Sequence, residues 1–318
     1  MDRILSQVQN PSMERPRALG FGAALEAGFQ IQATAWRWIA ALHVAWAAPL
    51  SVLHLAVAFA FGQDFEGALR RMAQSQRLDP ELLPFVLAMS ALAIVQSFSG
   101  LVLREGLARG FGAELLGRGP FDTLALFSWL KRSLGGAAMT AFILQLVLLG
   151  AFVLGLGAVG LGSAIVGGGA ALGSLPLTIL GGFLGAVAAF LGLFFAAGWA
   201  LRACLAPVVH AVEEGTGPDA IARSRVLLRE GGTGRIFVVL LGAALGAGAL
   251  GQGLAILMGA GVEAPGPWLA AARTVAFLFA WLPFEAYFSR VLTLLYFDRR
   301  ARLGEFEPAS RAGSESDA

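Results

Sequence analysis

Six long apolar runs divide the chain, and each is long enough to cross a bilayer as a helix. A hydrocarbon core about 30 Å thick requires about 20 apolar residues, because a helix rises 1.5 Å per residue. The third and fourth runs are separated only by residues 163–174, which are rich in Gly and Ala. The pattern predicts an all-α fold, an integral membrane bundle of six transmembrane helices. The runs are Trp36–Phe61, Leu83–Leu103, Ala137–Gly162, Leu175–Leu201, Ile236–Ala260 and Leu269–Phe297.

Basic residues gather on alternate connections between these runs, which orients the helices. With the N-terminus inside, the inner segments 1–37, 104–135, 201–235 and 298–318 hold 18 Arg and Lys residues, and the outer segments hold four. Cytoplasmic loops carry such an excess of basic residues. Five or seven helices would place one basic block on the wrong side. We therefore predict a multi-pass protein of the cytoplasmic (inner) membrane with both termini in the cytoplasm.

Two inner segments share a pattern that is typical of short helices lying at the membrane surface. Residues 117–132 and 215–232 both open with Gly-x-Gly-Pro and lead into an apolar run. Proline suits the first turn of a helix, and glycine suits the position just past its end. Near the N-terminus, Phe21, Leu25 and Phe29 share one helical face. We predict three cytoplasmic interfacial amphipathic helices, each preceding a transmembrane hairpin; alternatively, any helix that approaches a membrane has this pattern.

The same pattern predicts three parts along the chain. Residues 1–35 are predicted to form a cytoplasmic N-terminus with its interfacial helix, and residues 36–297 a six-helix membrane domain. Residues 298–318 are polar and close with Ser-Glu-Ser-Asp-Ala. A segment of this composition buries too little apolar surface to fold, so we predict a disordered cytoplasmic tail.

Composition supports the membrane assignment and excludes some functions. Of the 318 residues, 57% are hydrophobic and 14% are charged, whereas a soluble domain has about 25% charged residues. The net charge of +2 is too small to indicate nucleic-acid binding, and the one cysteine, Cys204, excludes an intrachain disulfide. We expect the lipid bilayer as a partner, with a membrane or cytoplasmic protein as a further partner, no nucleic acid and no cofactor.

Short motifs in the second half of the chain resemble those of a bacterial membrane protein family. They are Leu205-Ala-Pro-Val-Val, Glu213-Glu214-Gly215, Ala222-Arg223-Ser224 and the closing Tyr296-Phe297-Asp298-Arg299-Arg300. The family resembles the membrane domain that is fused to some glycerophosphodiester phosphodiesterases and more often stands alone. The resemblance implies a bacterial membrane protein, and it implies no activity. The fused enzyme needs a soluble catalytic barrel with paired histidines, and no segment here is long enough to form one.

Glu285 is the most informative polar residue, because it lies deep in the last apolar run. It precedes Asp298 by 13 residues, which is roughly 20 Å along a helix. A carboxylate at that depth costs several kcal/mol unless it is paired, protonated or hydrated. Arg290 lies about 140° around the helix from Glu285, so we expect no direct pair between them. Pro283 is expected to kink the helix just before Glu285.

Other polar residues allow two interpretations each. His210, Glu213 and Glu214 stand at i, i+3 and i+4, which would suit a metal ion if further ligands existed. We favour a structural role instead, in which Glu214 with Arg223 and Ser224 organises the turn as a salt bridge or cap. Four further residues, Gln96, Gln145, Gln252 and His54, would either hydrogen-bond neighbouring helices or line a solvated cavity.

Three functions are compatible with these patterns. We favour a non-enzymatic scaffold or accessory subunit, because we find no catalytic constellation and the inner face offers helices for docking. A permease or a protein that handles lipids or small solutes through Glu285 is the alternative, and a membrane-embedded hydrolase at His210 is a third. The polar positions singled out for a functional or structural role are Glu285, Arg290, Glu214, Arg223, Ser224, Asp298 and Arg300.

Overall fold

The computed structural model describes residues 20–31, 33, 35–75, 82–116, 123–229, 232–258 and 267–305. Within these residues the chain forms helices and no strand. The helices are α2 (Phe21–Phe29), α3 (Ala35–Ser75), α4 (Leu82–Leu115), α5 (Thr123–Ala171), α6 (Leu175–Ala203), α7 (Ala206–Glu213), α8 (Gly217–Arg229), α9 (Thr233–Leu257), α10 (Pro267–Ala280) and α11 (Leu282–Arg302). The all-α prediction is confirmed for this part of the chain.

Several of these helices have the length and apolarity that a membrane crossing needs. Among the described residues, Ala35–Phe61, Leu83–Leu115 and Thr233–Leu257 meet both conditions. A fourth candidate joins Ala271–Ala280 to Leu282–Arg302 across a bend of 46°. The expectation of a helical protein with several membrane-length helices is therefore met, and the number of six spans stays a prediction.

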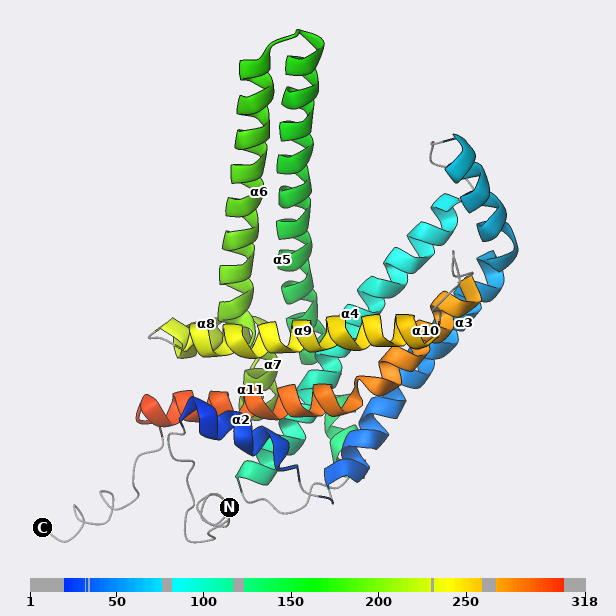
Figure 1. Cartoon of the computed structure of the whole chain (residues 1–318). Coiled ribbons are helices and arrows are strands. Elements are labelled where there is room, and N and C mark those ends of the chain that lie inside the picture. Colours follow the sequence, from blue (N-terminus) through cyan, green and yellow to red (C-terminus); the bar gives the residue numbers. More distant parts are fainter. Residues whose placement is uncertain are drawn as a thin grey trace, which may run out of the picture.

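The third and fourth apolar runs form the long antiparallel hairpin of α5 and α6, which stands away from the rest of the molecule (Figure 1). The two helices are separated by residues 172–174, where Gly173 has φ +64°, a conformation that glycine adopts without strain. At Gly181, a β-carbon would lie 2.5 Å from Cγ2 of Ile165. The missing side chain therefore lets α6 approach α5 closely.

The segments predicted to lie at the membrane surface differ from one another. Helix α8 begins at Gly217 and ends at Arg229, as its Gly-Pro pattern predicts. Before the third run the prediction of a separate short helix is wrong within the described residues, because α5 is continuous from Thr123. Residues 117–122 lie outside the described residues. No proline occurs between Thr123 and Ala171, so every residue of this stretch has an N–H for the helical hydrogen bonds.

Helix α2 is buried mainly through small residues, while Phe21 and Leu25 of the face that its spacing predicts are partly buried against the core. Ala24, Ala27 and Gly28 are buried, whereas Phe29 is 75% exposed and stacks on Tyr287 with ring centroids 4.2 Å apart. The small face lets the backbone of α2 lie directly against α11, where larger side chains would hold the two helices apart.

Helix α11 is the centre of the fold, since it contacts α2, α3, α4, α7, α8, α9 and α10. It lies beside α2 and runs with α9 across the base of the α5–α6 hairpin (Figure 1). The helix continues to Arg302, five residues past the predicted end at Phe297. The predicted boundary of the tail at residue 298 is therefore wrong, and residues 306–318 lie outside the described residues.

The break before α11 lies where the sequence predicts it. Helices α10 and α11 meet at Trp281 with a bend of 46°, and Pro283 occupies the first turn of α11. Proline has no N–H to donate, so it fits a first turn and ends the helix that precedes it. The bend places Glu285 in the first turn of α11.

The close packing of α2 on α11 yields a stability prediction. A β-carbon at Gly28 would lie 2.4 Å from Cγ2 of Val291 and 2.8 Å from the Tyr287 ring. Gly28→Val is expected to destabilise the fold by about 1–3 kcal/mol, because overpacking forces the helices apart. Thermal unfolding in detergent measures the effect. Gly22→Val on the same helix is the control, since nothing lies within 4 Å of that position; equal losses would contradict the packing.

Candidate functional site

Glu285 is buried, with 4% of its surface exposed, and it is paired. Arg104 of α4 donates from Nε to Glu285 Oε1 over 2.6 Å and from Nη2 to Oε2 over 3.4 Å. Trp281 donates from its indole nitrogen to Oε2 over 2.7 Å. A buried charge needs a partner and further hydrogen bonds, and Glu285 has both.

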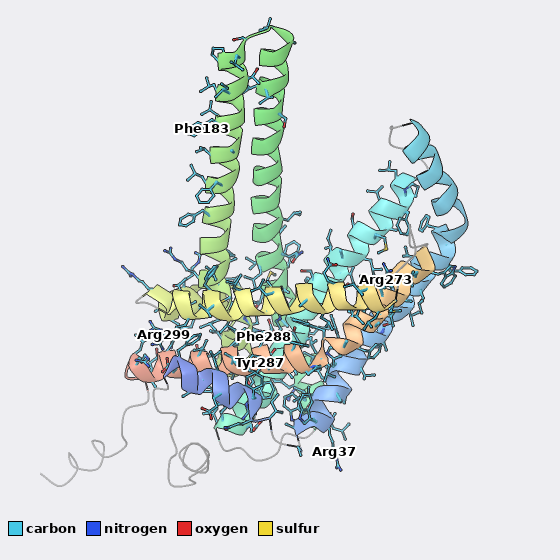
Figure 2. The ribbon with its side chains drawn as sticks, viewed as in Figure 1. Arg37, Phe183, Arg273, Tyr287, Phe288 and Arg299 are labelled. Atoms are coloured by element: carbon cyan, nitrogen blue, oxygen red, sulfur yellow. The ribbon has the colours of Figure 1, made fainter. Side chains whose placement is uncertain are left out.

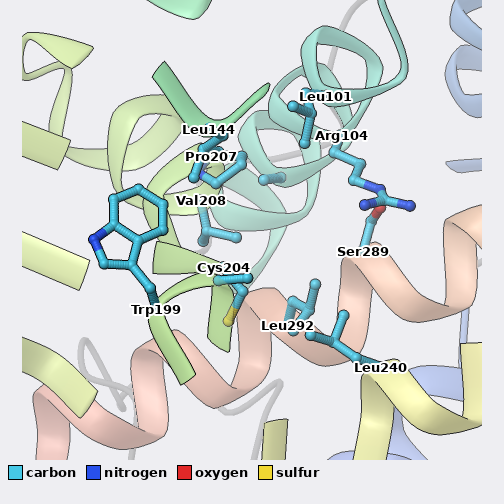
Figure 3. Close-up of a pocket in the computed structure, with 12 residues that line it drawn as sticks. Leu101, Arg104, Leu144, Trp199, Cys204, Pro207, Val208, Leu240, Ser289 and Leu292 are labelled. Atoms are coloured by element: carbon cyan, nitrogen blue, oxygen red, sulfur yellow. The ribbon is translucent and has the colours of Figure 1, made fainter. Parts of the chain in front are cut away.

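Two cavities meet at this ion pair. The larger has a volume of about 460 Å³, and its wall includes the polar groups of Trp46, Gln96, Ser97, Trp281 and Glu285. The smaller has a volume of about 150 Å³ and is lined mainly by apolar side chains of α4, α5, α6, α7, α9 and α11 (Figure 3). Leu101 and Arg104 line both cavities. The ion pair therefore stands between a larger cavity, which has several polar groups among its apolar side chains, and a smaller cavity that is almost wholly apolar.

Ser289 lies one turn after Glu285 and faces the smaller cavity. Arg104 lines the same cavity (Figure 3). The residue is 3% exposed, and Oγ has no hydrogen-bond partner among the described residues. An unpaired buried hydroxyl costs about 1–3 kcal/mol. The wall of the cavity thus contains a polar group that a bound molecule would satisfy.

The other polar residues at membrane depth divide between the two predicted roles. Gln96 lines the larger cavity. Gln145 of α5 accepts a hydrogen bond from Ser97 of α4 over 3.1 Å, so it connects two helices. His54 bonds the carbonyl of Leu50 within its own helix over 2.8 Å. A cavity with polar lining groups and a hydrogen bond between helices are therefore both present, whereas His54 fits neither role.

Arg290 takes no part in the Glu285 pair, as the helical geometry predicts. Its Nη1 donates to Glu114 of α4 over 3.1 Å, and its Nε donates to the Ala27 carbonyl of α2 over 3.2 Å. The guanidinium also lies 5.5 Å from the ring centroid of Phe111. Arg290 therefore joins α11 to α2 and α4.

The three residues that were candidates for a metal site point to different partners. His210 Nδ1 lies 2.8 Å from Glu105 Oε2 inside the bundle. Glu213 accepts a hydrogen bond from the Tyr296 hydroxyl over 2.7 Å, and Glu214 pairs with Arg109 over 2.7 Å. No group of three His, Cys, Asp or Glu residues within the described part of the chain is arranged to hold a metal.

The predicted salt bridge between Glu214 and Arg223 is wrong by one residue. Arg223 pairs with Glu213 over 3.4 Å and with Glu305. Glu214 has the left-handed backbone conformation, with φ 56°, which turns its side chain toward Arg109 of α4. The predicted cap at Ser224 is also absent, because its Oγ donates to the Arg202 carbonyl over 2.8 Å and so ties α8 to α6.

The closing motif forms a set of ion pairs at the C-terminal end of α11. Asp298 is buried and accepts hydrogen bonds from Arg302 over 3.0 Å and from Arg235 of α9 over 3.3 Å. Arg300 donates to the Tyr296 hydroxyl over 2.9 Å and to Glu305 over 2.7 Å. These contacts attach the end of α11 to neighbouring helices.

Glu305 joins the end of the described chain to α8. Partial burial alone would raise the pKa of the Glu305 carboxyl, but hydrogen bonds from Arg223 and Arg300 outweigh it and hold that pKa below its usual value. The charge on Glu305 therefore stabilises the folded state.

Sequence reasoning missed Arg104 and Ser289, which complete the site. Arg104 follows the second apolar run directly, so it has the appearance of an ordinary cytoplasmic basic residue. Ser289 is a common small residue in packed membrane helices. Helical spacing from Glu285 was a usable signal for Ser289, whereas nothing in the sequence relates Arg104 to α11.

No protein-family model matches the chain, and the comparisons with curated proteins and with solved structures give no match either. The family resemblance of the short motifs therefore stays a prediction. The fold and the site themselves define an all-helical protein with membrane-length apolar helices and an ion pair between two internal cavities.

The Glu305 contacts predict a pH dependence. Because its folded-state pKa is lowered, its stabilisation is present above the unfolded-state pKa of about 4.3 and is lost as the pH falls through the lower folded-state value. Glu305→Gln is therefore expected to unfold at a lower temperature than the wild type at pH 7, and the gap should shrink below pH 4. Thermal unfolding at several pH values measures this gap.

The control for this experiment is Glu26→Gln, which changes an exposed carboxylate on α2. It should lower the unfolding temperature at pH 7 far less than Glu305→Gln does. A gap between Glu305→Gln and the wild type that persists unchanged below pH 4 would contradict an electrostatic role for Glu305.

Proposed function

We propose that the protein crosses the cytoplasmic membrane six times and binds and hands on an amphiphilic small molecule, a lipid or small solute, without a chemical step. The observation that carries the proposal is the Arg104–Glu285 ion pair at the boundary of two adjacent cavities. The smaller cavity is almost wholly apolar, and the larger one has several polar side chains among its apolar ones. An amphiphile likewise has an apolar part and a polar part.

Glu285 is buried, whereas its partner Arg104 has 42% of its side chain exposed. The energetics of the buried carboxylate favour a functional role for this pair. Replacing a buried ion pair by apolar residues is often neutral or stabilising, so stability alone is a weak reason for the pair. Ionisable residues inside a membrane protein are costly, and they commonly mark the path or site of a ligand or proton. Glu285 and Arg104 fit this description, because both line the larger cavity.

The outer surface of the α5–α6 hairpin supports insertion in lipid. Large apolar side chains of α6 are exposed, and Phe183 points away from the hairpin (Figure 2). The exposed fractions of Ile179, Phe183, Phe190 and Phe194 lie between 62% and 67%. A contiguous apolar surface of this kind is rare on a soluble monomer. In a bilayer it would face acyl chains.

The proposed orientation predicts which side of the membrane each turn faces. In a Cys204→Ser background, a cysteine at Leu172, which is 76% exposed, should react with an impermeant maleimide on intact spheroplasts. A cysteine at Arg229, which is also exposed, should react only after the cells are permeabilised. Labelling of both positions from the same side would contradict six spans with an inner N-terminus.

The two adjacent cavities favour ligand handling over a scaffold role. A scaffold role stays a prediction, and a protein could perform both roles. A hydrolase receives less support, because His210, Glu213 and Glu214 point to separate partners among the described residues. The proposed function is accordingly a non-enzymatic one.

Retention of a bound amphiphile tests the proposal. Native mass spectrometry of the purified, delipidated protein should show the wild type with a bound amphiphile of one mass class. Ala108→Leu should reduce the bound fraction at least fivefold, because Ala108 lines the smaller cavity and the larger side chain would fill part of its 150 Å³.

The matched control is Ala113→Leu, at a buried position of the same helix that lines neither cavity. It should retain the amphiphile as the wild type does, with a similar loss of thermal stability. Equal retention by Ala108→Leu, or a folded wild type that retains no amphiphile, would overturn the proposed function.

A further inference from the structure

We infer that the joined cavities bind a single-chain amphiphile with an anionic oxygen head, and that each anion binds together with one proton, which Glu285 takes up. This inference rests on the proposed function and specifies its ligand. The anion would bind to Arg104 and Ser289, and the chain would lie in the apolar cavity.

The head site is defined by unused hydrogen-bond donors. A guanidinium has five N–H donors, and Arg104 uses two of them on Glu285, so three remain. Ser289 lines the same cavity as Arg104, is 97% buried, and its hydroxyl has no partner among the described residues (Figure 3). Arginine binds carboxylate, phosphate and similar oxygen anions in a bidentate manner, and a serine hydroxyl would donate a further bond.

The chain site is defined by the apolar wall. Leu101, Ala108, Leu144, Val208 and Leu240 contribute to it, with Trp199 at one end (Figure 3). A cavity of about 150 Å³ with such a lining is known to bind benzene, so this cavity holds about six carbon atoms. That volume suits the first part of one acyl or alkyl chain. Two chains side by side would not fit.

Charge balance requires the proton. Arg104 and Glu285 together have no net charge, so an added anion would leave one uncompensated negative charge beside Glu285, which is 4% exposed. If Glu285 gains a proton, the site returns to neutrality: one proton and one anion enter, Arg104 pairs with the anion, and Glu285 becomes a neutral carboxyl group. That carboxyl can still accept the Trp281 hydrogen bond.

The other groups around Glu285 leave it as the proton acceptor. His43 of α3 is buried, its Nε2 lies 2.7 Å from the Leu278 carbonyl oxygen, and it interacts electrostatically with Glu285. Cys204, at the end of α6, lines the smaller cavity. The residues of α7, α9 and α10 that line the two cavities are uncharged. Glu285 is the carboxylate that contacts Arg104 directly.

Binding of 1-decanesulfonate tests both parts of the inference, because this head keeps its charge at all relevant pH values. The protein is placed in phosphatidylcholine nanodiscs, and binding of the radiolabelled probe is measured between pH 6 and pH 8, with empty nanodiscs subtracted. Uptake of one proton per anion predicts that the affinity for the probe rises up to tenfold for each unit by which the pH falls.

Four variants separate the roles of the residues. Glu285→Gln is expected to bind the probe at pH 8 at least as tightly as the wild type binds it at pH 6, without pH dependence. His43→Gln should keep the wild-type dependence on pH. Ser289→Ala should weaken binding roughly three- to tenfold. Arg104→Gln combined with Glu285→Gln leaves no unpaired charge behind and should abolish binding, while unfolding with a single transition.

Related ten-carbon compounds identify the head. Decanoate should displace the probe more strongly if the natural ligand is a fatty acid, and decyl phosphate should displace it more strongly if the natural ligand is a phosphate ester. Wild-type binding without pH dependence, an unchanged pH slope in Glu285→Gln, or tighter binding of decanol or decyltrimethylammonium would overturn the inference. If native mass spectrometry still detects a retained neutral or cationic amphiphile, the proposed function stands and only its ligand class is wrong.

Discussion

Pairing of buried charge is the constraint on which this structure depends. A carboxylate or guanidinium that leaves water costs far more than one apolar contact returns, so each buried charge must meet an opposite charge or several hydrogen-bond partners. Helix α11 contains three such residues, Glu285, Arg290 and Asp298, each with an exposed fraction of 6% or less. Their partners lie on α4 and α9. The charges therefore determine which helices surround α11 and at which positions along α11 they make contact.

The same requirement leads from fold to site. The bend at Trp281 starts a new helix just before Glu285, and the indole of Trp281 donates to the carboxylate. Arg104 completes the pair from α4, and the space around the pair remains open as two cavities. A structural ion pair would normally be enclosed by packed side chains, because empty space forfeits dispersion contacts. Open space around this pair is the reason to assign it a ligand.

Glycine makes much of this arrangement sterically possible. At Gly136 a β-carbon would lie 2.3 Å from Nε2 of His210, and at Gly110 it would lie 2.5 Å from the Trp38 ring. His210 and Trp38 therefore fit inside the bundle because each of them faces a glycine on the neighbouring helix. Gly110 and Gly136 lie just outside the apolar runs, and each contributes directly to the packing of a buried tryptophan or histidine.

Local chemistry in the sequence was enough to predict the helical class of the described residues, the starts of most long helices, the bend at Pro283 and the need of Glu285 for a partner. These features depend on the length of apolar runs, the missing N–H of proline and the cost of a lone buried charge. The packing of the helices was needed to identify Arg104 as the partner, to pair Arg223 with Glu213 and not with Glu214, and to place Ser289 at a cavity. Arg104 and Glu285 are 181 positions apart, and helical periodicity describes only neighbours within a few turns. Which helices meet depends on how all of their surfaces pack at once.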